Sequence, residues 1–506
     1  MTLAVDDRLT DTGAAVEQPA QFRALATANR GRKAIFGLLW SILNTGSATI
    51  IAAIVFVITS RLLGPVEFGI VALAVSMVTF VSCATPASFG EAIIQRAQIA
   101  EEHLDTVFWM CVISGVVLYL PILLLAGTVA DYTGEPVLAV LLPFIGLKLV
   151  IDLFAVVPQA LVVRAMQFKY IAARTAIGNS IGGAVCIAMA LAGYGLWALA
   201  MAPVITSVVS TAILVVAARW RPGFRISKTA ARDLMRFGLF SSGNRILNVI
   251  SLDKILLGFL AGPAVLGLYF LGKRLHDLLS GLTSGALYPV ATVFFAAIQK
   301  EPGKQVRPFA LVTCASALAT FPISAGLFVL ADTAIPMILG NQWQSAILTI
   351  QAFAVIGFLA GLQVSTGSLA VGLGRADIWF VFDLVLYALT LAVIVLFIGQ
   401  GLDTVMIGIV IVNVAVAPGC FIIAHKLIGI TLAQYAKTLM APVVATIAMC
   451  IVLVVLPLVL TATSAVMLLV TQIGAGALTY AIIAFAMSRA EIAEIRQAMA
   501  NGKSHE

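Results

Sequence analysis

Charged residues are scarce in this chain. Only 10% of its 506 residues are Asp, Glu, Lys or Arg, whereas 61% are hydrophobic. Soluble globular domains carry about 25% charged residues, so the composition excludes that class. The apolar runs are continuous over about 20 residues or more, whereas the strands of a membrane β-barrel alternate apolar and polar residues over about ten positions. The sequence therefore predicts an all-α polytopic membrane protein.

Residue patterns for metal, nucleotide or covalent chemistry are also lacking. The chain has four histidines and six cysteines, and every cysteine lies within an apolar run without a partner at ligand spacing. No phosphate-cradling glycine motif with its lysine occurs. No connection on the outer side exceeds about a dozen residues, which leaves no room for a catalytic domain there. We expect no enzymatic activity, no cofactor, no metal and no nucleic-acid partner, and a transporter remains.

Basic residues predict the orientation of the chain. We expect fourteen membrane spans, the first over residues 34–60, and most of the 30 Lys and Arg residues fall in the two tails or in the even-to-odd connections. The opposite connections hold a single base, Arg61, together with acids such as Glu135 and Asp332. Because cytoplasmic loops retain Lys and Arg, this pattern predicts that both termini are cytoplasmic.

A glycine-proline motif occurs twice. Gly64–Gly69 reads GPVEFG and Gly262–Gly267 reads GPAVLG, each at the outer end of a predicted span. A second pair, Gly193–Leu196 and Gly399–Leu402, lies at nearly the same offset. Because six spans is an even number, a duplication gives two six-helix lobes of equal orientation, followed by two C-terminal helices. The predicted segments are a cytoplasmic N-terminal tail 1–33, an N-lobe 34–218, a basic cytoplasmic linker 219–236, a C-lobe 237–428, two added helices 433–487 and a cytoplasmic C-terminal tail 488–506.

The predicted eighth span, 264–296, carries charges near its middle. Lys273 and Asp277 lie on one polar stripe, and a charge that faces hydrocarbon costs several kcal/mol, so the stripe should face a protein interior or a water-filled cavity. Arg274 lies about 100° round the helix from Lys273 and has no acid four residues away on its own face. A guanidinium suits a diphosphate, so Arg274 is the first candidate for an anionic substrate, and Arg245 in the seventh span, 237–260, is the second.

Two pairs of opposite charge lie four residues apart within spans. Lys148 with Asp152, and Lys273 with Asp277, are either structural ion pairs between packed helices or ligand-binding groups, and the spacing alone leaves both readings open. Asp383 in the span 376–398 is either a proton or cation site or the partner of a base on a neighbouring helix. Asp383, Asp277 and Asp152 are therefore the candidates for ion coupling.

Several motifs resemble one family of exporters. They are Thr59–Gly69, Pro158–Leu161 with Arg164 and Phe168 after it, Gly195–Leu199, and Leu252–Lys254 with Leu266–Tyr269. Together these resemble the bacterial polysaccharide-export flippases, the Wzx-like, PST-type members of the MOP exporter superfamily. The resemblance covers about residues 34 to 430.

That resemblance implies a MOP/MATE-like, V-shaped bundle that opens alternately to the two sides of the bacterial inner membrane. The implied cargo is an undecaprenyl-diphosphate-linked oligosaccharide, and the implied partners are a polymerase and a chain-length regulator of the export pathway. The family's cationic cavity corresponds by position and charge to Lys148, Arg245, Lys273 and Arg274, with Arg61 at the outer edge. We expect a monomer.

Three alternatives stay open at this point. A cation-coupled multidrug exporter of the same superfamily would prefer an acidic cavity, against the excess of bases in spans 4, 7 and 8. A membrane-embedded polysaccharide polymerase or glycosyltransferase would need a large outer loop and an acidic catalytic pair. A purely structural scaffold would have no use for charges within its spans.

Overall fold

The computed structural model describes residues 49–86, 89–96, 99–227, 251–301, 303–460 and 464–487. In these residues every regular element is a helix, and twelve helices are long and apolar enough to cross a membrane. The predicted first and seventh spans lie partly outside the described residues, so the count of fourteen stays a prediction. The all-α membrane class is confirmed.

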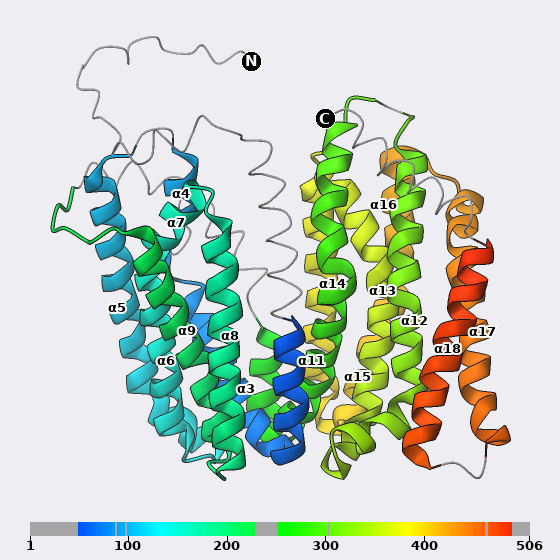
Figure 1. Cartoon of the computed structure of the whole chain (residues 1–506), viewed down its shortest axis with the longest axis horizontal. Coiled ribbons are helices and arrows are strands. Elements are labelled where there is room, and N and C mark those ends of the chain that lie inside the picture. The colour runs from blue at the N-terminus through cyan, green and yellow to red at the C-terminus, as the bar shows by residue number, and fades with distance from the viewer. Residues whose placement is uncertain are drawn as a thin grey trace.

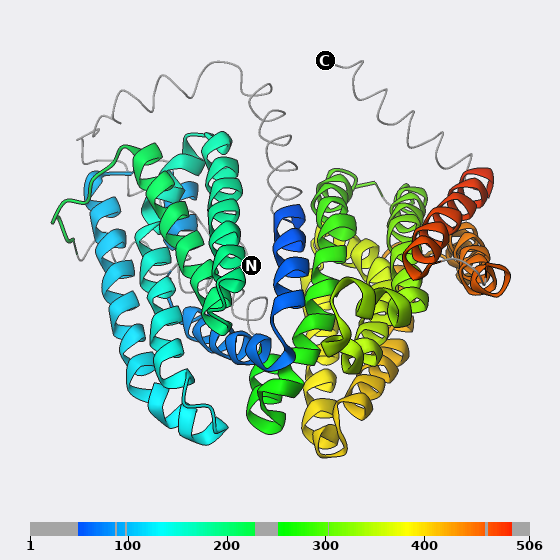
Figure 2. The same cartoon turned by 60° about the horizontal axis from the view of Figure 1, so that its bottom comes forward.

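The helices form two lobes that lie side by side (Figure 1). The N-lobe contains the helix Thr49–Leu62, α3 (Pro65–Ser82), α4 (Phe89–Gln95), α5 (Glu101–Thr133), α6 (Leu138–Phe154), α7 (Val156–Arg164), α8 (Phe168–Leu191) and α9 (Leu196–Ala218). The C-lobe contains α11 (Leu252–Ala297), α12 (Val306–Ile338), η2 (Asn341–Ala346), α13 (Ile347–Gly372), α14 (Ala376–Phe397), η3 (Ile398–Gln400), α15 (Leu402–Val416) and α16 (Pro418–Ile428). Two further helices, α17 (Leu432–Val459) and α18 (Ala465–Met487), pack on α12 at the outer edge of the C-lobe (Figure 2).

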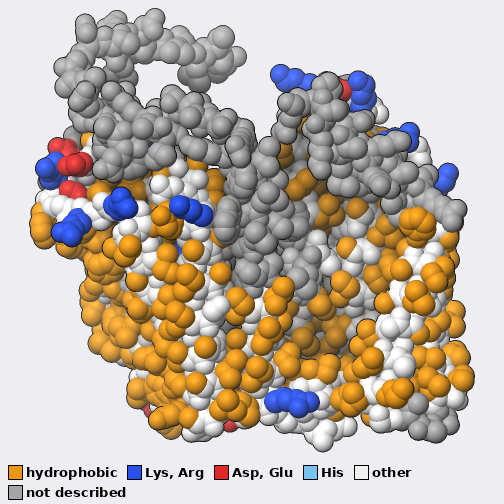
Figure 3. Space-filling model, viewed as in Figure 1, with side chains coloured by type: hydrophobic (Ala, Val, Ile, Leu, Met, Phe, Trp, Pro, Cys, Tyr) orange, Lys and Arg blue, Asp and Glu red, His pale blue; other side chains and the backbone are white. Residues whose placement is uncertain are grey.

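The surface has the pattern of a membrane protein. Hydrophobic side chains cover the sides of the molecule, and the visible Lys and Arg side chains gather mainly at one end (Figure 3). Large apolar side chains such as Leu124, Val216 and Leu396 are more than two-thirds exposed. Since the aqueous exposure of so many such residues is unfavourable, this belt is the lipid-facing surface.

α11 reverses direction at Gly262. This glycine has φ of 83°, in the left-handed region, and separates two helical limbs. Asp253 on the first limb bonds with Lys273 on the second, and on a straight helix these residues would be about 30 Å apart. α11 is therefore a helical hairpin, as the predicted boundary between the seventh and eighth spans requires.

The two glycine-proline motifs pack against each other. A methyl group at Gly69 on α3 would overlap the carbonyl of Pro263, and a methyl group at Gly267 on α11 would overlap the carbonyl of Pro65. The sixth residue of each motif thus contacts the second residue of the other. Small residues let helix backbones approach closely in a membrane, so this reciprocal contact joins the lobes where α3 crosses α11.

The predicted second span, 68–94, is wrong in its second half. α3 ends at Ser82, and a short separate helix, α4, follows. Pro86 lies in the break, and it has no amide for a helical hydrogen bond and disfavours the helical conformation of Thr85 before it. A similar break separates α6 from α7 at Ala155, because Pro158 has no amide to donate to the carbonyl of Phe154.

The start of the central linker docks on α5. The Gly223 amide donates to the buried Asp105 carboxylate at 2.9 Å, and Arg225 forms an ion pair of 2.7 Å with Glu101. The rest of the predicted linker, up to residue 236, lies outside the described residues.

We predict that Gly69→Ala lowers the stability of the purified protein. The added methyl group forces α3 away from α11, and overpacking of this kind costs about 1 to 3 kcal/mol. The matched control is Gly127→Ala on α5, where a methyl group would meet no atom within 4 Å. Thermal unfolding in detergent checks the prediction, and an unchanged midpoint for Gly69→Ala would contradict the close contact.

Candidate functional site

A buried ion pair joins the two limbs of α11. The Lys273 ammonium pairs with Asp253, whose side chain is only 1% exposed, and the Tyr269 hydroxyl donates to the same carboxylate oxygen at 2.7 Å. The network reaches α14, because the Leu252 amide donates to the Tyr387 hydroxyl at 2.9 Å. This polar cluster fixes the hairpin against the C-lobe.

The interpretation of Lys273 and Asp277 as an ion pair is wrong. Lys273 pairs with Asp253 instead, because the hairpin brings this carboxylate directly opposite the ammonium group. Asp277 is exposed and forms no ion pair with a described residue. Sequence spacing did not reveal the pair, because its members are twenty residues apart and meet only through the turn at Gly262.

Arg274 faces the N-lobe. It lies midway between Gly267 and Gly281, and residues seven apart share a helix face to within about 20°. Gly267 packs on the Pro65 carbonyl of α3, and a methyl group at Gly281 would lie 3.6 Å from the Thr49 hydroxyl of the first described helix. The side of α11 that carries Arg274 is therefore the side turned towards the other lobe.

Within the described residues, Arg274 has no hydrogen-bonded or ion-paired partner, although its side chain is partly buried. A guanidinium is always charged in proteins and presents five donors. An unpaired cation between two lobes inside the apolar belt is a suitable contact for an anionic ligand.

Arg61 lies at the end of the first described helix and crosses to the C-lobe. Its Nε donates to the carbonyl of Ile338 at 2.6 Å, and its guanidinium also bonds the carbonyl of Met337. Beside it, the Trp343 indole donates to the carbonyl of Ser60 at 2.7 Å. These bonds satisfy carbonyls at a helix end and tie the lobes together near the reciprocal glycine contact.

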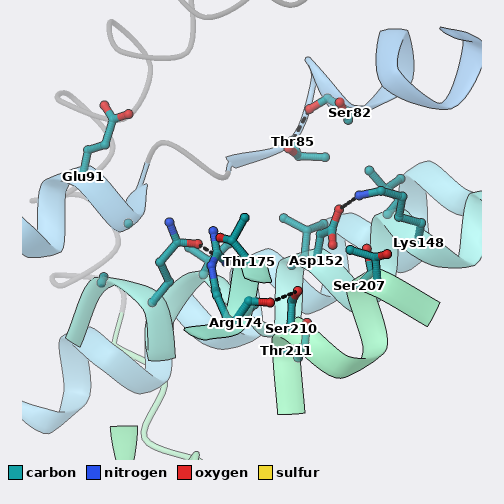
Figure 4. Close-up of a pocket in the computed structure, with 18 of the residues that line it drawn as sticks. Ser82, Thr85, Glu91, Lys148, Asp152, Arg174, Thr175, Ser207, Ser210 and Thr211 are labelled. Atoms are coloured by element: carbon teal, nitrogen blue, oxygen red, sulfur yellow. Dashed lines mark hydrogen bonds and ion pairs between the residues drawn. The ribbon is translucent and has the colours of Figure 1, made fainter. Parts of the chain in front are cut away.

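The N-lobe contains a polar cavity of about 550 Å³. It lies among α4, α6, α7, α8, α9 and the end of α3 with the connection that follows it. Lys148 and Asp152, one turn apart on α6, form an ion pair at its wall, with side chains 34% and 48% exposed (Figure 4). The predicted pairing of these two residues is thus present, and it faces a cavity instead of a packed helix interface.

Arg174 is the residue of this cavity that the sequence did not indicate. α8 begins at Phe168, so Arg174 lies within the first two turns of a helix that lines the cavity. Its guanidinium donates to the Gln159 side-chain oxygen at 3.1 Å, while its Nε is buried without a partner in the described residues (Figure 4). The polar and small residues Thr175, Gly178 and Asn179 share its helix, and that stripe was the available signal.

Two other predicted residues have different outcomes. Asp383 on α14 is exposed and forms no ion pair with a described residue, so the pairing alternative finds no support here. Tyr387, one turn further, contacts α11, which places this side of α14 towards the hairpin. Arg245 lies outside the described residues.

In the described part of the chain no group of three His, Cys, Asp or Glu side chains is placed to hold a metal ion.

We predict that the two ion pairs differ in their contribution to stability. Breaking the pair of Asp253 and Lys273 by Asp253→Asn leaves the partly buried Lys273 ammonium unpaired, at a cost of about 3 kcal/mol. The same change in the solvated pair, Asp152→Asn, should cost about 1 kcal/mol or less. Unfolding midpoints in detergent compare the two variants. Equal losses would contradict the difference in burial.

Comparison with known proteins gives relatives along most of the chain. The lipopolysaccharide biosynthesis protein WzxC of Escherichia coli (strain K12) is 27% identical over 434 residues, covering 81% of this chain and 85% of WzxC. The succinoglycan biosynthesis transport protein ExoT of Rhizobium meliloti (strain 1021) is 26% identical over 323 residues, covering 63% of this chain and 64% of ExoT.

The fold is also that of a solved structure. The lipid II flippase MurJ, in an inward closed conformation, superposes with a TM-score of 0.72 at 12% identity, covering 90% of this chain and 99% of MurJ. This likeness establishes the arrangement of the helices alone.

The family described as polysaccharide biosynthesis protein matches residues 58–348, more than half of the sequence. The chain is therefore a multi-pass membrane protein that belongs to the polysaccharide biosynthesis protein family.

Proposed function

We propose that this protein is a flippase that moves an undecaprenyl-diphosphate-linked oligosaccharide from the inner to the outer leaflet of the bacterial inner membrane. The cargo supplies the synthesis of an exported polysaccharide or lipopolysaccharide. Two relatives named for lipopolysaccharide biosynthesis and succinoglycan transport support this role. The protein acts as a monomer with both termini cytoplasmic, and delivers its product to a polymerase and a chain-length regulator.

The position of Arg274 is the main support for this proposal. Its helix face is turned towards the N-lobe, and no described residue forms an ion pair with it, although the Asp277 carboxylate three residues along the helix interacts with its charge. A diphosphate needs a cation that the protein has not already paired, and a guanidinium offers two parallel hydrogen bonds to phosphate oxygens. Arg274 therefore binds the diphosphate between the lobes.

The other predicted cations take supporting places in this proposal. Lys273 adds charge next to Arg274 while Asp253 fixes its position. Arg245 contributes from the part of the seventh span outside the described residues. Lys148 contacts the cargo in the N-lobe cavity. Arg61 contacts it at the outer end, where the cargo leaves.

The lobes alternate between two openings. At the end that carries Arg61, the C-lobe is bound to the first described helix by the Trp343 and Arg61 hydrogen bonds. Release of the cargo on that side requires these bonds and the contact between α3 and α11 to open. Asp383, Asp277 and Asp152 are carboxylates within spans, and we propose them as the groups whose protonation or cation binding drives the change.

We predict that Arg274→Ala abolishes export of the polysaccharide while the protein stays inserted. A charge-assisted contact contributes about 1.5 to 3 kcal/mol, so binding of the diphosphate should weaken about 10- to 150-fold. Arg274→Lys keeps the charge without the paired geometry and should restore export only in part. Surface polysaccharide and protein abundance are measured together in a strain that lacks the chromosomal gene.

The matched control is Arg221→Ala, which removes an exposed arginine from the linker. Export should stay at the wild-type level in this variant. Normal export by Arg274→Ala at normal abundance would remove Arg274 from the site.

A further inference from the structure

The wall of the N-lobe cavity is rich in hydroxyl groups whose protons are already used. Thr175 donates to the carbonyl of Ile171 at 3.1 Å, Ser210 to that of Arg174 at 3.2 Å, and Thr211 to that of Ile151 at 3.3 Å. A hydroxyl has one proton and two lone pairs. Each of these oxygens therefore presents an acceptor, and the wall suits a ligand that donates hydrogen bonds.

The charges of the described residues that line the cavity balance. Lys148 and Arg174 are the cations among them, and Asp152 and Glu91 are the anions. Lys148 is paired with Asp152, and Arg174 is bonded to the neutral side chain of Gln159. The described part of the wall therefore has no excess of positive charge.

The described part of the wall therefore suits a diphosphate poorly as the main ligand of this cavity. Phosphate oxygens are acceptors without protons, so they would face the carboxylates and the hydroxyl oxygens unfavourably. A lipophilic cation is equally unsuited, since none of the described residues that line the cavity is aromatic. An uncharged sugar both donates and accepts at each hydroxyl, so it matches the acceptors on the wall together with the Lys148 and Arg174 side chains, which donate.

We propose that the N-lobe cavity binds uncharged sugar residues of the lipid-linked cargo, while the diphosphate lies at Arg274 on the C-lobe. This inference rests on the proposed function, because it divides one cargo between two sites. The volume of about 550 Å³ lies within the range of about 300 to 1,000 Å³ common for small-ligand pockets, enough for a short stretch of oligosaccharide. Lys148 is a sugar contact here, held in place by Asp152.

The test uses two separate halves of the cargo. The full chain is purified in detergent and titrated with the repeat-unit oligosaccharide released from the host polysaccharide, which has no lipid or phosphate. A second titration uses undecaprenyl diphosphate without sugar. Isothermal calorimetry gives the dissociation constant for each ligand with each variant.

Two cavity variants separate binding from folding. Thr175→Val removes one acceptor without a change in volume, and should weaken sugar binding about three- to tenfold. Arg174→Gln removes a charged donor, with an expected loss of about tenfold or more. Both variants should bind undecaprenyl diphosphate as the wild type does. The matched control is Thr404→Val on α15, a threonine that also donates to the carbonyl four residues earlier but lies outside the cavity.

Several outcomes would overturn the inference. One is that the free oligosaccharide does not bind the wild-type protein, and another is that the cavity variants weaken undecaprenyl diphosphate instead of sugar. A loss that Thr404→Val shares equally would also count against it. Arg274→Ala should weaken undecaprenyl diphosphate alone, so its result tests the proposed function separately from the sugar site.

Discussion

The contact between α3 and α11 determines how the lobes are placed. It depends on glycine at two positions, since any side chain at Gly69 or Gly267 would meet a backbone carbonyl of the other helix. The contact also fixes the rotation of α11. With Gly267 against the N-lobe, Arg274 two turns along the same face must also turn towards that lobe. A structural requirement for close packing thus determines where the unpaired charge is presented.

Charged side chains inside the apolar belt have different surroundings in the two lobes. In the C-lobe a fully buried carboxylate is paired with Lys273 and holds the hairpin together, which leaves Arg274 without an ion-paired partner among the described residues. In the N-lobe cavity the pair of Lys148 and Asp152 is partly exposed, the charges of the described lining residues balance, and hydroxyl oxygens lie around them. A cargo with an anionic head and uncharged sugars has parts that match both environments. The proposed division of the cargo between the two sites rests on the chemistry of each wall, because hydrogen-bond acceptors do not attract phosphate oxygens.

Local features of the fold were predictable from the sequence, and long-range ones were not. The turn at Gly262-Pro263 follows from residue types, since glycine permits the positive φ and proline begins the next helix. The pair of Lys148 and Asp152 follows from helical spacing. The pair of Asp253 and Lys273 does not, because it depends on the geometry of the hairpin. Arg174 could not be placed on α8 from composition, because helix ends are poorly defined when charged residues lie in the first two turns.

Direct observation of lipid movement tests the central claim most directly. The full chain is reconstituted into vesicles that contain a fluorescent undecaprenyl-diphosphate-linked oligosaccharide, and a reagent that cannot cross the membrane quenches the pool in the outer leaflet. The account predicts that the protein brings the protected pool to the quencher, and that Arg274→Ala removes this movement. A protected pool that stays constant with folded wild-type protein, while the same lipid binds to it, would contradict a flippase.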